Sequence, residues 1–104
     1  MTELLSRADR VAALARLANW RAVDRGKAIT RTFTFDGFNA AFGFMARTAL
    51  VAEKMDHHPD WSNSYDKVVV TLSTHSAGGV TSADILLAEA MDEIAGKLSA
   101  RQQR

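Results

Sequence analysis

The chain has no cysteine, only one proline and a net charge of +1, and these absences exclude several classes of protein. Without cysteine it can form no disulfide, no thiolate zinc site and no catalytic thiol. Its 13 Lys and Arg residues are scattered and nearly balanced by 12 Asp and Glu. Nucleic-acid binding usually needs a clustered basic face. We therefore expect neither a disulfide scaffold nor contact with nucleic acid.

Long hydrophobic runs are also missing. An apolar run such as 40–46 is far shorter than the ~18 residues that favour a membrane span. The first residues show no basic stretch followed by an apolar one, which is the pattern of a secretory signal. Together with the lack of cysteine, this favours a cytoplasmic protein without membrane contact. The 104 residues, 47% of them hydrophobic, fit a single domain over 1–104 with one core.

Hydrophobic periodicity predicts an α+β protein with the element order α-β-β-α-β-β-α. The expected helices run from a cap at Ser6 to about residue 19, over 38–55, and from a capping-box-like start at 81–84 to about residue 100. The expected strands cover 20–23, 29–35, 61–65 and 68–74. Two hairpins separated by a long helix predict one four-stranded antiparallel sheet with the helices on one face.

Local signals add detail to this outline. The pair Asp36-Gly37 is expected to end a strand and cap the middle helix, and a tight turn is expected at 66–67. One stripe at helical spacing predicts the core-facing side of the middle helix; it consists of Phe38, Phe42, Met45, Ala49 and Ala52. The corresponding stripe of the last helix consists of Leu87, Met91, Ile94 and Leu98.

All three histidines lie between positions 57 and 75. His57 and His58 stand where the middle helix breaks at Pro59, and His75 stands where the last strand ends. Because the predicted hairpin pairs these two segments, it can bring the histidines together. Imidazoles give and take protons near neutral pH. Carboxylates can orient them, and the candidates nearby are Glu53, Asp56 and Asp84.

Structural explanations compete with each of these candidates. A single histidine is usually a surface residue. Three histidines at the ends of two adjoining elements are harder to explain in this way. A metal site is disfavoured, because adjacent histidines project in different directions and no His-x₃-His pair exists. Asp84 could serve only as a helix cap. Glu53 and Asp56 could belong only to the helix surface and its end. Trp61 and Tyr65 could be core residues or walls for a flat ligand.

Three sequence segments resemble a known family. The string Glu53-x₃-His57-His58-Pro59 is followed by Tyr65, His75 and Asp84 after five, nine and eight intervening residues. This pattern resembles the signature of the pterin-4a-carbinolamine dehydratases. The segment Phe35-x-x-Phe38-Asn39-x-Ala41-Phe42-Gly43-Phe44-Met45 and the early Trp20 are similar to the same family, and the resemblance covers about 17–100. Two departures are Ser76, where some members carry an acidic residue, and Ser62, where others have an aromatic one.

The resemblance implies a function. It implies dehydration of a 4a-hydroxytetrahydropterin to quinonoid dihydropterin, with no metal or organic cofactor. The implied acid/base set is His57, His58 and His75, with His58 preferred as the general acid. The implied substrate contacts are Asp56, His57, His58, Ser73, Thr74, His75 and Ser76, and the implied supporting residues are Glu53, Trp61 and Asp84.

Two other functions stay open. Related proteins act as dimerisation, assembly or transcriptional-cofactor modules, and a dehydratase could act on a molybdopterin-related pterin. Relatives without catalysis tend to lose the histidines, so the presence of all three favours an enzyme. The resemblance also implies a homodimer or homotetramer.

Overall fold

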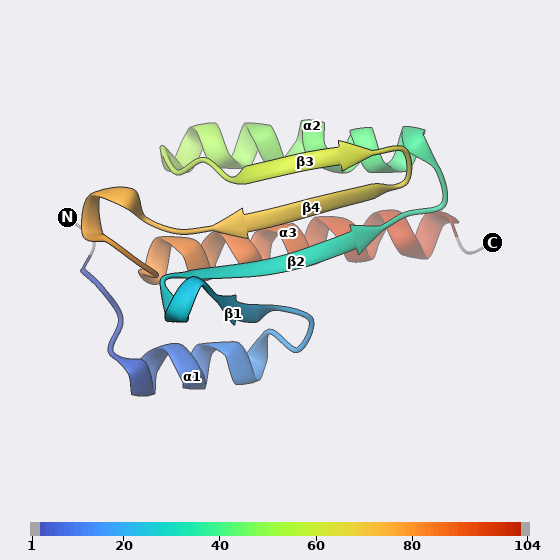
Figure 1. Cartoon of the computed structure of the whole chain (residues 1–104). Helices are drawn as coiled ribbons and strands as arrows, with labels where there is room; N and C mark the ends of the chain where they lie inside the picture. Colours follow the sequence, from blue (N-terminus) through green and yellow to red (C-terminus); the bar gives the residue numbers. More distant parts are fainter. Residues whose placement is uncertain (1–2, 103–104) are drawn as a thin grey trace.

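The computed structural model describes residues 3–102 and contains three helices, four strands and two short 3₁₀ turns. In chain order they are α1 (Arg7–Arg16), β1 (Arg21–Val23), η1 (Asp24–Gly26), β2 (Ala28–Thr34), α2 (Phe38–Met55), β3 (Asp60–Ser64), β4 (Lys67–Leu72), η2 (His75–Ala77) and α3 (Ser82–Gln102) (Figure 1). The predicted order α-β-β-α-β-β-α is confirmed. Within residues 3–102, no helix combines the length and the apolar character needed to cross a membrane.

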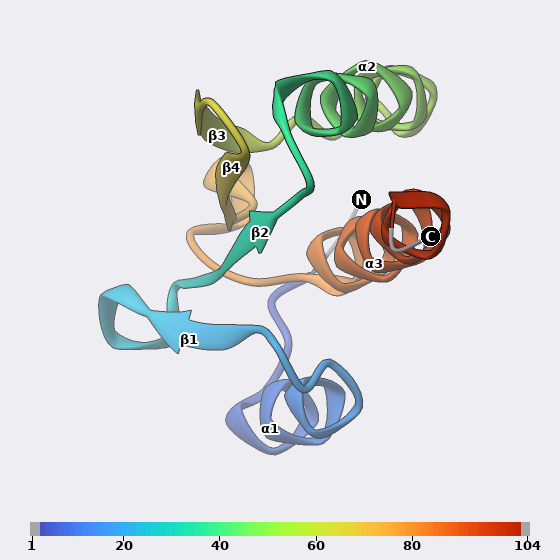
Figure 2. The same cartoon turned by 90° about the vertical axis from the view of Figure 1, so that its right-hand side faces the viewer.

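The four strands form one antiparallel sheet in the order β1-β2-β4-β3. Figure 2 shows α2 and α3 behind one face of this sheet and α1 beside β1, while no helix within residues 3–102 covers the opposite face. Burial alternates along β4, since Val68, Val70 and Leu72 are buried whereas Val69 is exposed. The α+β fold with helices on one side of an antiparallel sheet is therefore as predicted.

The starts of α1 and α3 follow the local sequence as predicted. Ser6 caps α1 by accepting the backbone N–H of Asp9 at 3.0 Å. At α3, Thr81 and Asp84 form a reciprocal cap, in which the Asp84 carboxylate accepts the Thr81 N–H and the Thr81 hydroxyl accepts the Ala83 N–H. The end of α1 differs from the prediction. The helix stops at Arg16 because the next residues form a turn that buries Trp20.

The second hairpin turns one residue earlier than predicted. Its two-residue loop is 65–66, with Tyr65 at a φ of 51°, and Ser64 pairs with Lys67. β4 ends at Leu72, two residues early, because Thr74 leaves the ladder to pair with Gly79 across η2. The resulting register places Asp60 opposite Thr71.

The predicted core stripe of α2 is only partly right, because Ala52 is buried and Met45 packs against the core, but Phe38, Phe42 and Ala49 are exposed. Phe38 and Phe42 are 49% and 57% exposed. The buried residues of α2 are Ala40, Ala41, Phe44, Thr48 and Ala52. Phe44 packs against Phe33 and Phe35 of the sheet side, with ring centroids 4.6 and 5.1 Å away. Both stripes have helical spacing, so periodicity could not decide between them.

The predicted side-chain cap of α2 is absent. Asp36 does not cap the helix, because its N-cap is Gly37 without a side-chain hydrogen bond.

Candidate active site

A cavity of about 380 Å³ lies at the end of the sheet where β2 and β3 begin and β4 ends. It is lined by Asp24, Lys27, Ala28, His58, Asp60, Thr71, Ser73, His75 and Gly78. Paired residues of antiparallel strands share a face, so Asp60 and Thr71 lie on the same side. Because the neighbours of Thr71 on β4 are buried toward the helices, this side is the helix-free face of the sheet.

Three of the predicted site residues line this cavity, namely His58, Ser73 and His75. Four polar lining residues were not predicted as site residues: Asp24, Lys27, Asp60 and Thr71. The strand order explains the first two, because it places the β1–β2 turn beside the end of β4. The Ser73 hydroxyl donates to the Lys27 carbonyl at 2.7 Å and ties the two segments together.

The end of α2 directs His58 toward the cavity. Asp56 adopts the left-handed conformation that asparagine and aspartate tolerate best, with a φ of 54°. The His57 N–H then bonds back to the Ala52 carbonyl at 3.0 Å, which reverses the chain after the helix. On the last turn of α2, a carboxylate oxygen of Glu53 lies 2.8 Å from Nε2 of His58. Glu53 therefore holds one of the two cavity imidazoles.

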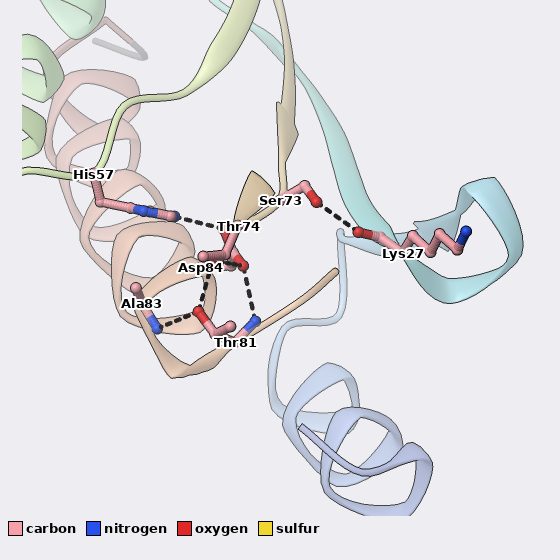
Figure 3. A network of polar contacts seen from close by, with 7 residues as sticks. All are labelled: Lys27, His57, Ser73, Thr74, Thr81, Ala83 and Asp84. Atoms are coloured by element: carbon pink, nitrogen blue, oxygen red, sulfur yellow. Dashed lines mark hydrogen bonds and ion pairs between the residues drawn. The ribbon is translucent and has the colours of Figure 1, made fainter. Parts of the chain in front are cut away.

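His57 is directed to the opposite side and is outside the cavity lining. Its Nε2 atom lies 2.6 Å from an oxygen of Asp84, whose side chain is fully buried. The other Asp84 oxygen accepts the Thr74 hydroxyl at 2.8 Å and the Thr81 N–H at 2.9 Å (Figure 3). His57, Thr74 and Asp84 thus form a buried network behind the cavity.

The remaining predicted residues lie around this arrangement. Asp56 and Ser76 are exposed and do not line the cavity. Trp61 is partly buried and packs against the hydrophobic core. The structure therefore brings together two imidazoles and several strand-end polar groups in one cavity, with a third imidazole held nearby by a buried carboxylate. Such a set can move protons at a bound polar molecule.

The family model described as pterin 4 alpha carbinolamine dehydratase matches residues 3–94. The chain belongs to this pterin-4-alpha-carbinolamine dehydratase family. A protein of Afipia carboxidovorans that bears the family name is 62% identical over 97 residues, which cover 93% of this chain and 97% of the relative. A similarly named protein of Rhodopseudomonas palustris is 57% identical over 101 residues, covering 97% of this chain and all of the relative. Pterin-carbinolamine dehydratases are hydro-lyases, so family membership identifies the chain as an enzyme of that class.

One solved structure agrees with this assignment, and a second shares the fold. The crystal structure of a Brucella melitensis protein described as a transcriptional coactivator/pterin dehydratase has a TM-score of 0.86 and 53% identity. It covers 88% of this chain and 98% of its own. A pterin dehydratase-like protein described as a RuBisCO assembly factor of the alpha-carboxysome has a TM-score of 0.65 and 23% identity over 75% of this chain and 90% of its own. The second likeness concerns the fold alone.

Proposed function

We propose that the chain dehydrates a 4a-hydroxytetrahydropterin to the quinonoid dihydropterin by histidine acid/base catalysis. The observation that carries this proposal is the cavity lined by both His58 and His75. Its volume of about 380 Å³ is within the usual range of small-ligand sites, roughly 300–1,000 Å³. Its polar lining offers partners for the amide-like edge of a pterin.

The reaction needs one proton delivered and one removed. The 4a-hydroxyl is a poor leaving group and departs as water when an acid protonates it. The lone pair of the neighbouring ring nitrogen forms the new C=N bond, and a base takes the proton that the ring then loses. Water is the only other product, so atoms and charge balance. We assign the acid to His58, whose ring Glu53 holds, and the receiving base to His75 on the same cavity. His57, which Asp84 holds nearby, is the third member of this acid/base set.

A stopped-flow ultraviolet assay tests this proposal. A 4a-hydroxytetrahydropterin is generated in the syringe, and its dehydration is followed with and without the protein. We expect acceleration by the native chain and a loss of about 10²-fold or more in His58→Ala and His75→Ala. Ser6→Ala, which removes only the α1 cap, is the control and keeps the rate. A folded native protein that accelerates nothing would refute the assignment.

The physiological setting follows from the same chemistry. A 4a-hydroxytetrahydropterin is the pterin product of aromatic amino-acid hydroxylases, so we place the enzyme in tetrahydrobiopterin recycling, in the cytoplasm. A molybdopterin-related carbinolamine is the competing substrate. Comparing kcat/KM for the two pterins in the same assay decides between them.

We also infer that the chain self-associates as a homodimer or homotetramer through α2. This helix is apolar on two sides, and the sheet and α3 cover only one of them. The exposed side consists of Phe38, Phe42 and Leu50, and the first two rings contact each other with centroids 5.7 Å apart. An apolar stripe of this kind on a monomer marks an interaction surface.

A further inference from the structure

Asp84 is a carboxylate with no exposure to solvent, yet three polar partners surround it. One oxygen faces His57, and the other accepts both the Thr74 hydroxyl and the Thr81 N–H. Buried carboxylates are costly unless such donors satisfy them. The far oxygen accepts from both donors, and the carboxylate acts as a hydrogen-bond acceptor on both of its oxygens.

The hydroxyl protons of this network can be assigned by elimination. The single Thr74 hydroxyl proton goes to Asp84. The contact of 2.7 Å between the Thr74 and Thr81 hydroxyls therefore uses the proton of Thr81. The Thr81 oxygen in turn accepts the Ala83 N–H at 3.3 Å. All donors in the chain Ala83–Thr81–Thr74–Asp84 point toward the carboxylate.

This direction bears on which ring nitrogen of His57 donates to Asp84. We propose that the Thr81–Thr74–Asp84 chain holds His57 as an Nε2–H donor, which leaves Nδ1 as the only ring nitrogen able to accept a proton. Asp84, Thr74 and Thr81 are then positioning residues that act through the His57 ring. In a neutral histidine, the hydrogen bonds that the two ring nitrogens make decide which of them carries the proton.

Thr74 is assigned here a different role from direct substrate contact. Its hydroxyl is committed to Asp84, and its side chain is buried outside the cavity lining. A binding residue and a positioning residue differ in their kinetics. Loss of a binding contact raises KM, whereas loss of a positioning contact lowers kcat and leaves KM unchanged.

The decisive experiment uses Asp84→Asn and a two-bond ¹H–¹⁵N correlation spectrum of the neutral histidine rings. In the variant, Thr74 and the Thr81 N–H still require an oxygen, so the new amide NH₂ group faces His57. Nε2 must then accept, and the proton moves to Nδ1. We expect the Nε2–H tautomer in the native protein and the Nδ1–H tautomer in Asp84→Asn. A variant ring that keeps Nε2–H, or a native ring with the proton on Nδ1, overturns the proposal.

This spectrum needs no turnover, so its outcome is independent of the proposed dehydratase function. If the tautomers behave as expected but no pterin is dehydrated, the function fails and the assignment of His57 stands. The His57 tautomer can be tested even if Asp84→Asn does not fold, because the native spectrum shows directly which ring nitrogen carries the proton.

A second experiment tests the threonines in the dehydration assay, and here the inference rests on the proposed function. Thr74→Val removes the donor at nearly constant volume, while Thr74→Ser keeps it. We expect kcat to fall about tenfold in Thr74→Val at unchanged KM, and Thr74→Ser to stay close to native. Thr81→Val should lower kcat by a smaller factor, and Ser6→Ala, which also removes a helix cap, should not. A rise in KM at constant kcat in Thr74→Val would show substrate binding and overturn the positioning role.

Discussion

His57 and His58 are neighbours in the chain, but their carboxylate partners lie in opposite environments. Glu53 and His58 form a pair whose side chains are 79% and 58% exposed, whereas the Asp84 side chain is fully buried. Exposed ion pairs contribute between 0 and about 1 kcal/mol to stability. We therefore predict that Glu53→Gln changes the free energy of unfolding by less than about 0.5 kcal/mol in urea titrations.

The same variant should lower the dehydration rate only a few-fold, because solvent already screens the pair. Asp84→Asn provides the contrast, since it reverses the hydrogen bond to His57 in a buried site. A rate loss in Glu53→Gln as large as that in Asp84→Asn would contradict this ranking of the two carboxylates.

At the scale of elements, β2 and the segment before β1 are tied to α3 by one carboxylate. An Asp92 oxygen accepts Arg31 at 2.6 Å and the Trp20 indole N–H at 2.8 Å, and the Arg31 and Asp92 side chains are only 21% and 28% exposed. Removing the acceptor leaves two donors in a half-buried place. We predict that Asp92→Ala lowers the free energy of unfolding by about 2 kcal/mol, and Asp92→Asn by about half as much.

Urea unfolding at one fixed protein concentration measures both variants, because self-association makes stability depend on concentration. The slope with urea should stay constant, which shows that the unfolded surface is unchanged. Arg31 also lies 4.1 Å from the centre of the Phe33 ring, a contact that both variants keep. Equal stability of Asp92→Ala and the native chain would mean that packing alone holds α3 to the sheet.

The elements also show which features the sequence could predict. The caps at Ser6 and at Thr81 with Asp84 were predictable, because each depends on residues three positions apart. The contribution of Asp24 and Lys27 to the cavity was not, because it follows from the pairing of β2 with β4, about 40 residues apart in the chain. The hydrogen-bond network of His57 also depends on contacts between segments that are far apart in the chain. Its members belong to three segments that only the folded chain brings together.

The side of α2 that faces the core could not be predicted from the sequence, for a different reason. Phe38 and Phe42 repeat at helical spacing as regularly as the residues that are buried. Periodicity identifies an apolar side but not the partner that covers it. Two apolar sides on one helix of a small chain imply two partners, and only one of them, formed by the sheet and α3, belongs to the same chain.

At the scale of the whole molecule, the exposed apolar side of α2 predicts that the chain self-associates. A second copy of the chain presents the same apolar stripe, and a two-fold axis can pair the two stripes. We predict that the native protein sediments as a dimer or tetramer, and that Phe42→Glu shifts it toward the monomer by placing a charge in the stripe. Leu86→Glu on α3 is the matched control, since Leu86 is 58% exposed and Phe42 is 57% exposed. If both variants keep the native mass, or if the native chain is monomeric at micromolar concentration, α2 is not the interface. If only Phe42→Glu dissociates, the stripe that misled the sequence-based core prediction is the contact between subunits.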